Sequence, residues 1–166
     1  MEPKQKKDFV LPVSIVTESD VSRLIFELEA IEEFFLQVKV RRAGDSMNLP
    51  RTSPAMEEVV SQNGLNLLKD VDRDKLKFIL TTIRTKSPVI HMSFSNSPNQ
   101  KFLEKLISWM RLNISEVIIL QIGLQPNIGA GFTLRTNNKF FDFSLRQHLN
   151  QHSQLIIDEL KKGLAE

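Results

Sequence analysis

The spacing of apolar residues predicts a long amphipathic helix over residues 17–40. Apolar side chains recur there every three or four positions, as one face of a helix requires. These positions are Val21, Leu24, Ile25, Leu28, Ile31, Phe34, Phe35 and Val38. Thr17 and Asp20 have the spacing of a capping box, so we expect the helix to begin there. Its apolar stripe either belongs to the core, which is the interpretation we favour, or docks in part against a partner helix.

A segment rich in glycine and proline follows the long helix. Residues 43–54 contain one glycine and two prolines, and we interpret them as a linker. Ser53 and Pro54 are preferred residues at the start of a helix, and Gly64 is placed to end one. We therefore expect a short second helix between Ser53 and Gly64.

A third helix is predicted to stop at Pro88. Asp70 or Asp72 can cap its start, and its apolar residues keep helical spacing. These residues are Leu76, Ile79, Leu80 and Ile83. We expect residues 1–16 to form an N-terminal tail and residues 17–87 to form a helical region.

The hydrophobic period changes from helical to alternating after Pro88. Ile90, Met92 and Phe94 alternate with more polar positions, which predicts a strand with two unlike faces. Ser97-Pro98 has the pattern of a helix start. The continuous apolar run over residues 117–120 then predicts a buried strand, parallel to the first through a right-handed crossover.

Two further strands are predicted at residues 131–136 and 139–144. They are separated by Asn137-Asn138, a pair that tolerates positive φ and can form a tight primed turn. An amphipathic helix is expected to follow to the C-terminus. The fold class is therefore α/β (α+β): N-terminal helices, then a small βαββα domain over residues 88–166. We expect a mixed three-stranded sheet and a C-terminal amphipathic helix in that domain.

Composition narrows the function classes. Hydrophobic residues make up 41% of the chain, enough for one core with a small helical extension. A net charge of +2, with no basic stripe interleaved with aromatics, predicts no nucleic-acid partner. The absence of cysteine excludes disulfides and thiolate catalysis. No apolar run is long enough to span a bilayer, so we expect no direct membrane insertion.

The residues offer no convincing catalytic site. His148 and His152 are four positions apart and could face one metal ion, but they lack the glutamate of an HExxH motif and a third ligand. His91 is interpreted as a half-buried structural side chain rather than a general base. Residues 129–131 contain two glycines but precede a strand, unlike a phosphate-binding loop. We predict no catalytic residue, no metal and no cofactor.

The polar residues at the end of the last strand are interpreted as structural. Ser144 is a plausible N-cap of the final helix. Asp142 can pair either with Arg135 across the hairpin or with Arg146. Opposite charges at this junction would fix the angle at which the helix leaves the sheet.

A spaced set of residues around the hairpin resembles the C-terminal signature of the delta subunit of F-type ATP synthases, called the oligomycin-sensitivity-conferring protein in mitochondria. These signature residues are Pro126, Gly131, Arg135, Lys139, Asp142, Ser144 and Arg146. Asn137-Asn138 replaces the family's usual Gly-Asp, and Ala130 replaces its first glycine. The resemblance covers residues 88–166, whereas the family's N-terminal six-helix bundle is reduced or replaced here.

The resemblance implies a non-catalytic stator subunit that links the peripheral stalk to the catalytic head. Its implied partners are the b-type stalk subunit and the alpha subunits of the head, with a cytoplasmic location at the membrane through the synthase complex. Candidate partner-binding residues are Phe132, Phe141, Phe143, Leu149 and Leu155. The alternative is a stand-alone protein-interaction or assembly module that retains the delta-like C-terminal domain.

Overall fold

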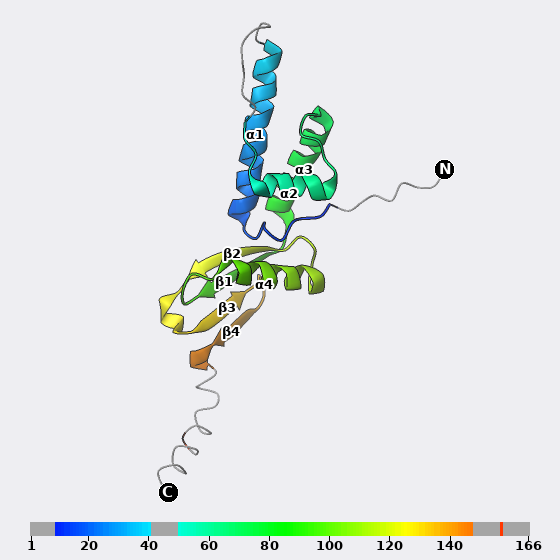
Figure 1. Cartoon of the computed structure of the whole chain (residues 1–166). Coiled ribbons are helices and arrows are strands. Elements are labelled where there is room, and N and C mark those ends of the chain that lie inside the picture. The colour runs from blue at the N-terminus through cyan, green and yellow to red at the C-terminus, as the bar shows by residue number, and fades with distance from the viewer. Residues whose placement is uncertain (1–8, 41–49, 148–156, 158–166) are drawn as a thin grey trace, which may run out of the picture. The chain divides into compact units, whose positions relative to one another are not determined.

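The computed structural model describes residues 9–40, 50–147 and 157. In that part of the chain the helices and strands follow one another as Figure 1 shows. The elements are α1 (Glu18–Val40), α2 (Pro54–Asn63), α3 (Asp70–Lys86), β1 (Val89–Phe94), α4 (Gln100–Asn113), β2 (Ile119–Leu124), the 3-10 helix η1 (Pro126–Ile128), β3 (Gly131–Arg135) and β4 (Phe140–Ser144). The expected mixture of helices and strands is confirmed. Residues 145–147 are helical, and the rest of the expected C-terminal helix, apart from Ile157, lies outside the described residues.

The chain divides into two compact units, and the division passes through α4 and β2. The first unit combines the residues up to Pro88 with Glu104–Ile119. The second combines Val89–Leu103 with the residues from Leu120 onward. Each unit therefore contains segments that are distant in sequence.

Three of the predicted helix ends are confirmed by their hydrogen bonds. The Asp20 N–H donates to Thr17 Oγ1 (3.2 Å) and the Thr17 N–H donates to Asp20 Oδ2 (2.9 Å), which is a reciprocal capping box. Ser53 Oγ accepts from the N–H of Met56 (3.2 Å) at the start of α2. Gly64 ends α2 in the left-handed conformation at φ 61°.

The core of the first unit forms where α1 packs against α2 and α3. The buried apolar side chains of these helices are Val21, Leu24, Ile25, Leu28, Ile31, Met56, Val59, Leu76, Leu80 and Ile83. The predicted stripe of α1 is core only up to Ile31, because Phe34 and Phe35 are half-buried and Val38 is exposed. Ile15, which precedes α1, is fully buried in the same core.

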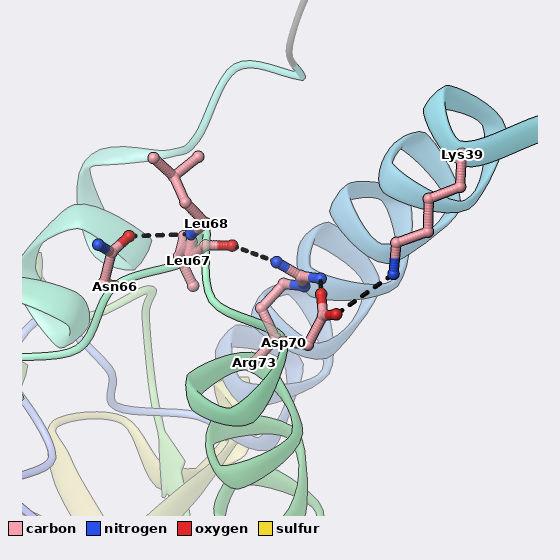
Figure 2. Close-up of polar contacts among 6 residues, drawn as sticks. All are labelled: Lys39, Asn66, Leu67, Leu68, Asp70 and Arg73. Atoms are coloured by element: carbon pink, nitrogen blue, oxygen red, sulfur yellow. Dashed lines mark hydrogen bonds and ion pairs between the residues drawn. The ribbon is translucent and has the colours of Figure 1, made fainter. Parts of the chain in front are cut away.

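A network of charges joins the end of α1 to the start of α3 (Figure 2). Asp70 accepts from Lys39 Nζ (3.2 Å) and pairs with Arg73, which also donates to the Leu67 carbonyl (2.6 Å). The hydrogen bond and charge of Lys39, with the charge of Arg73, hold the pKa of Asp70 below its usual value. The Arg73 guanidinium lies 4.4 Å from the centre of the Phe35 ring. The prediction that Asp70 or Asp72 caps α3 is wrong: Lys69 is the N-cap residue, without a side-chain bond.

The guanidinium of Arg111 binds several carbonyls of the segment before α1. Arg111 donates to the carbonyls of Leu11 (3.0 Å), Pro12 (2.7 Å) and Ile15 (2.5 Å), and more weakly to that of Ile118 (3.3 Å). Burial lowers the pKa of Arg111 to about 10, so the side chain still carries its charge at neutral pH. These bonds satisfy backbone groups of a segment that belongs to no helix or strand. We call this set of bonds the Arg111 clamp.

The four strands form one sheet in the order β2-β1-β3-β4, so the prediction of a three-stranded sheet is wrong. Backbone bonds from Ile119 to Pro88 (3.2 Å) and from Gln125 to Phe94 (2.8 Å) join residues with the same separation, so β1 and β2 run parallel as expected. β3 pairs antiparallel with both β1 and β4. All four strands join one sheet because β1 pairs along both of its edges, with β2 on one edge and the hairpin on the other.

Two boundaries in this region differ from the expected ones. β2 begins at Ile119 and runs to Leu124, beyond the apolar run that predicted it. α4 begins at Gln100, where Asn99 Oδ1 accepts from the N–H of Lys101 (2.9 Å), so Asn99 and not Ser97 caps it. Among the described residues, no helix combines the length and the apolar character needed to cross a bilayer.

Replacing Arg111 with methionine should destabilise the first unit. Arg111→Met keeps much of the side-chain volume but leaves carbonyls of residues 11, 15 and 118 without their donor, which we expect to cost about 2–4 kcal/mol. Urea unfolding measures the change. The exposed Arg84 provides the control, since Arg84→Met should change stability by less than about 0.5 kcal/mol. Equal effects of the two substitutions would show that the clamp contributes nothing beyond charge.

Candidate functional site

The register of the hairpin puts its apolar side chains on one face of the sheet. Phe132 lies opposite Phe143, and Leu134 lies opposite Phe141. On the other side of β3, Phe132 lies opposite Phe94 of β1. Directly opposed residues project to the same side. We call the side chains of Phe94, Phe132, Phe141 and Phe143 the aromatic face.

The rings of the aromatic face form a continuous row that becomes more exposed toward β4. Ring centroids are 5.8 Å apart for Phe94 and Phe132, 5.1 Å for Phe132 and Phe143, and 6.3 Å for Phe143 and Phe141. Phe102 of α4 contacts the Phe94 ring at 6.1 Å, and Phe94 is only 6% exposed. By contrast, Phe141 is 42% exposed and Phe143 is 55% exposed. The row therefore offers an apolar surface at β4, the last strand of the sheet order.

Gly131 allows the two arms of the hairpin to approach each other. Its φ is +94°, and an added Cβ would lie 2.3 Å from the carbonyl oxygen of Phe143. Gly129 also has positive φ, at +77°, but an added Cβ there would meet nothing within 4 Å. Ala130, between them, has no positive φ. The prediction that these glycines have a conformational role is confirmed, and the close approach is specific to Gly131.

The predicted primed turn at Asn137-Asn138 is wrong, because neither residue has positive φ. The Thr136 N–H donates to the Lys139 carbonyl (2.8 Å), and Thr136 Oγ1 accepts from the Lys139 N–H (3.2 Å). The Thr136 hydroxyl thus accepts the hydrogen bond from Lys139 that the Thr136 carbonyl would accept in a regular two-residue hairpin. A side chain that satisfies the turn in this way removes the need for left-handed residues.

Asp142 and Ser144 organise the exit of the chain from β4. Asp142 Oδ1 accepts from the N–H of Ser144 (2.8 Å), and Ser144 Oγ accepts from the N–H of Gln147 (3.3 Å), as the predicted N-cap does. Hydrogen bonds from the side chain and backbone of Ser144, with a smaller effect of the Arg146 charge, hold the pKa of Asp142 below its ordinary value. Arg135 lies opposite Phe140 instead of Asp142. Of the two partners considered for Asp142, Arg146 is the one whose charge acts on it.

The remaining predicted residues lie in several different places in the structure. Pro126 begins η1, and Lys139 closes the hairpin turn. Leu149 and Leu155, like His148 and His152, lie outside the described residues. His91 is exposed rather than half-buried. In the described part of the chain, no three histidine, aspartate or glutamate side chains come together as a metal site requires.

Exposed aromatic side chains also lie outside the aromatic face. Phe140 is 64% exposed, and as the register partner of Arg135 it lies on the face opposite the aromatic face. The alternation of Phe140 with Phe141 and Phe143 along the strand predicts a hairpin with apolar side chains on both faces. Trp109 is exposed on α4.

The chain matches no protein-family model, and a search of curated proteins finds no match.

The close approach at Gly131 can be separated from its positive φ by two matched substitutions. Gly131→Ala should destabilise the hairpin by about 3 kcal/mol or more, because strain at positive φ is joined by a backbone collision. Gly129→Ala should cost only about 1 kcal/mol, since its Cβ would enter open space. Denaturant unfolding followed by near-ultraviolet circular dichroism measures both. Equal costs would contradict the packing described for Gly131.

Removal of the Ser144 hydroxyl should raise the pKa of Asp142 toward its ordinary value of 3.8. The folded pKa is lowered, so the stabilisation is present above that ordinary value and is lost as pH falls through the folded pKa. Carboxyl NMR titration of the wild type and Ser144→Ala measures the change. Thr136→Ala, which removes a hydroxyl elsewhere in the hairpin, should leave this pKa unchanged. A wild-type pKa at or above 3.8 would contradict the assignment.

Proposed function

We propose that this protein is a non-catalytic, delta-type stator subunit of an F-type ATP synthase. The observation that carries the proposal is the exposed part of the aromatic face at β4, next to the signature residues that resemble the delta family. A stator must resist torque through a tight contact, and large apolar side chains provide most of the energy of such contacts. The protein would bind its partners in the cytoplasm and reach the membrane through them.

The proposed partner at the aromatic face is an amphipathic helix of the b-type stalk subunit. Phe141 and Phe143 are exposed, and their rings stack on each other at an interplanar angle of 14°. Phe132 supports them from β3 at 5.1 Å, so the exposed pair rests on a packed base. A helix that places apolar residues at i, i+3 and i+7 can lie across such a strip. The catalytic-head alpha subunits would then contact other surfaces.

The alternative is a stand-alone interaction or assembly module. It is favoured by the first unit, which has three helices before Pro88 in the described residues instead of the six-helix bundle expected of the delta family. Both functions use the aromatic face, but they differ in partner. A gene located among those of the other synthase subunits would support the stator, and an isolated gene beside a complete delta gene would support the module.

Co-purification from native membranes tests the stator function and the binding surface together. Tagged wild-type protein should bring down stalk and catalytic subunits, and the absence of both would reject the proposal. The double variant Phe141→Ser with Phe143→Ser should reduce recovery of the stalk subunit by at least about tenfold, as expected when two interface anchors are lost. Phe78→Ser on α3 removes a phenylalanine that is even more exposed and should leave recovery unchanged. Unfolding curves must show that the double variant is folded; retention of the stalk subunit by that folded variant would reject the aromatic face as the surface.

A further inference from the structure

The face of the sheet opposite the aromatic face carries a polar groove. The residues that line it include His91, Ser93, Gln125, Thr133, Arg135 and Phe140. The groove has a volume of about 630 Å³, within the range of pockets that hold a small organic ligand. It belongs entirely to the second unit.

Strand register brings two cationic or ionisable side chains together at one end of the groove. His91 of β1 lies directly opposite Arg135 of β3, and Arg135 lies opposite Phe140 of β4. The next pair along the same face is Ser93 with Thr133, which supplies two hydroxyl groups. The groove thus has a guanidinium and an imidazole at one end and hydroxyls along its floor.

Gly123 of β2 leaves space beside Ser93 on the polar face, because it has no side chain. Its backbone does not require glycine, since its φ is not in the left-handed region. An added Cβ would nevertheless lie 3.3 Å from Ser93 Oγ, which is a tight contact on the polar face. A glycine inside a strand without a conformational need often marks the close approach of a ligand or another backbone.

The charge of the groove selects the class of ligand. None of its lining residues is acidic. The nearest carboxylate on this face is that of Asp142, which lies opposite Thr133 and accepts from the N–H of Ser144. Within the described ranges, neither Arg135 nor His91 forms an ion pair with a carboxylate. A guanidinium without a carboxylate partner, beside several neutral donors, matches an oxyanion. The exposed Phe140 ring next to Arg135 offers a surface on which a planar group can stack.

We propose that this groove binds a small phosphate-bearing molecule. The phosphate would contact Arg135 and His91, with Ser93 and Thr133 as further hydrogen-bond donors. A planar group on the same molecule would lie against Phe140. The proposal does not depend on the stator function, because it uses the other face of the sheet.

NMR titration of the full chain tests the groove with two probes that carry one phosphate each, sodium phosphate and AMP. Each should cause saturable shifts of the backbone amides around residues 91–93 and 133–135. Tighter binding of AMP than of phosphate would support a contact between its ring and Phe140, and equal binding would contradict that contact. The absence of saturable shifts with both probes at millimolar concentration would overturn the proposal.

Matched variants separate the groove from general charge attraction. Arg135→Gln should weaken phosphate binding by at least about tenfold, as expected on losing a charged hydrogen bond. Arg146→Gln removes the same charge from an exposed position in the same unit and should weaken it by less than about twofold. Amide spectra without ligand establish that both variants are folded. Equal loss in the two variants would also overturn the proposal.

Discussion

The second unit depends on β1, a strand that is paired along both edges and has two chemically different faces. Its parallel edge holds β2 and its antiparallel edge holds the hairpin. Its alternating side chains then give one face to Phe94 and its buried neighbours and the other to His91 and Ser93. Because register is transmitted from strand to strand, this one alternation sets which residues of β3 and β4 share each face.

Both proposed surfaces follow from that constraint. The aromatic face continues the apolar side of β1 outward through Phe132 to β4, where its exposure rises. The polar groove continues the other side of β1 through Thr133 and Arg135. A slip of one residue between β1 and β3 would exchange these surfaces, which makes the pairing of Phe94 with Phe132 critical for either function.

Much of this arrangement was predictable where a local pattern has a local cause. The capping box at Thr17, the start of α2 at Ser53 and the left-handed Gly64 each depend on residues close in sequence. The alternation in β1 was equally readable, since a half-buried strand imposes it directly. Within the candidate site, the shared face of Phe132, Phe141 and Phe143 followed from the same rule once the hairpin was recognised.

Other features could not be predicted from the sequence. Some depend on a choice between several turn conformations, and others on contacts between residues that are distant in sequence. Thr136 closes the hairpin with its hydroxyl, a choice that Asn137-Asn138 does not reveal. The number of strands in the sheet depended on whether β1 would pair along one edge or along both, which tertiary contacts decide. The Arg111 clamp could not be predicted from the sequence. The carbonyls that it binds belong to residues about a hundred positions earlier, and a backbone carbonyl is the same in every residue.

The Arg111 clamp also orders events during synthesis. The segment that contains Leu11 and Ile15 leaves the ribosome long before Arg111 and Ile119, which complete the same core. Every residue of the second unit's first strand is made in between. Contacts of such long sequence separation form late, since the closure of a large loop must precede them. The first unit is therefore the first to be translated but cannot be finished until the chain has begun the sheet.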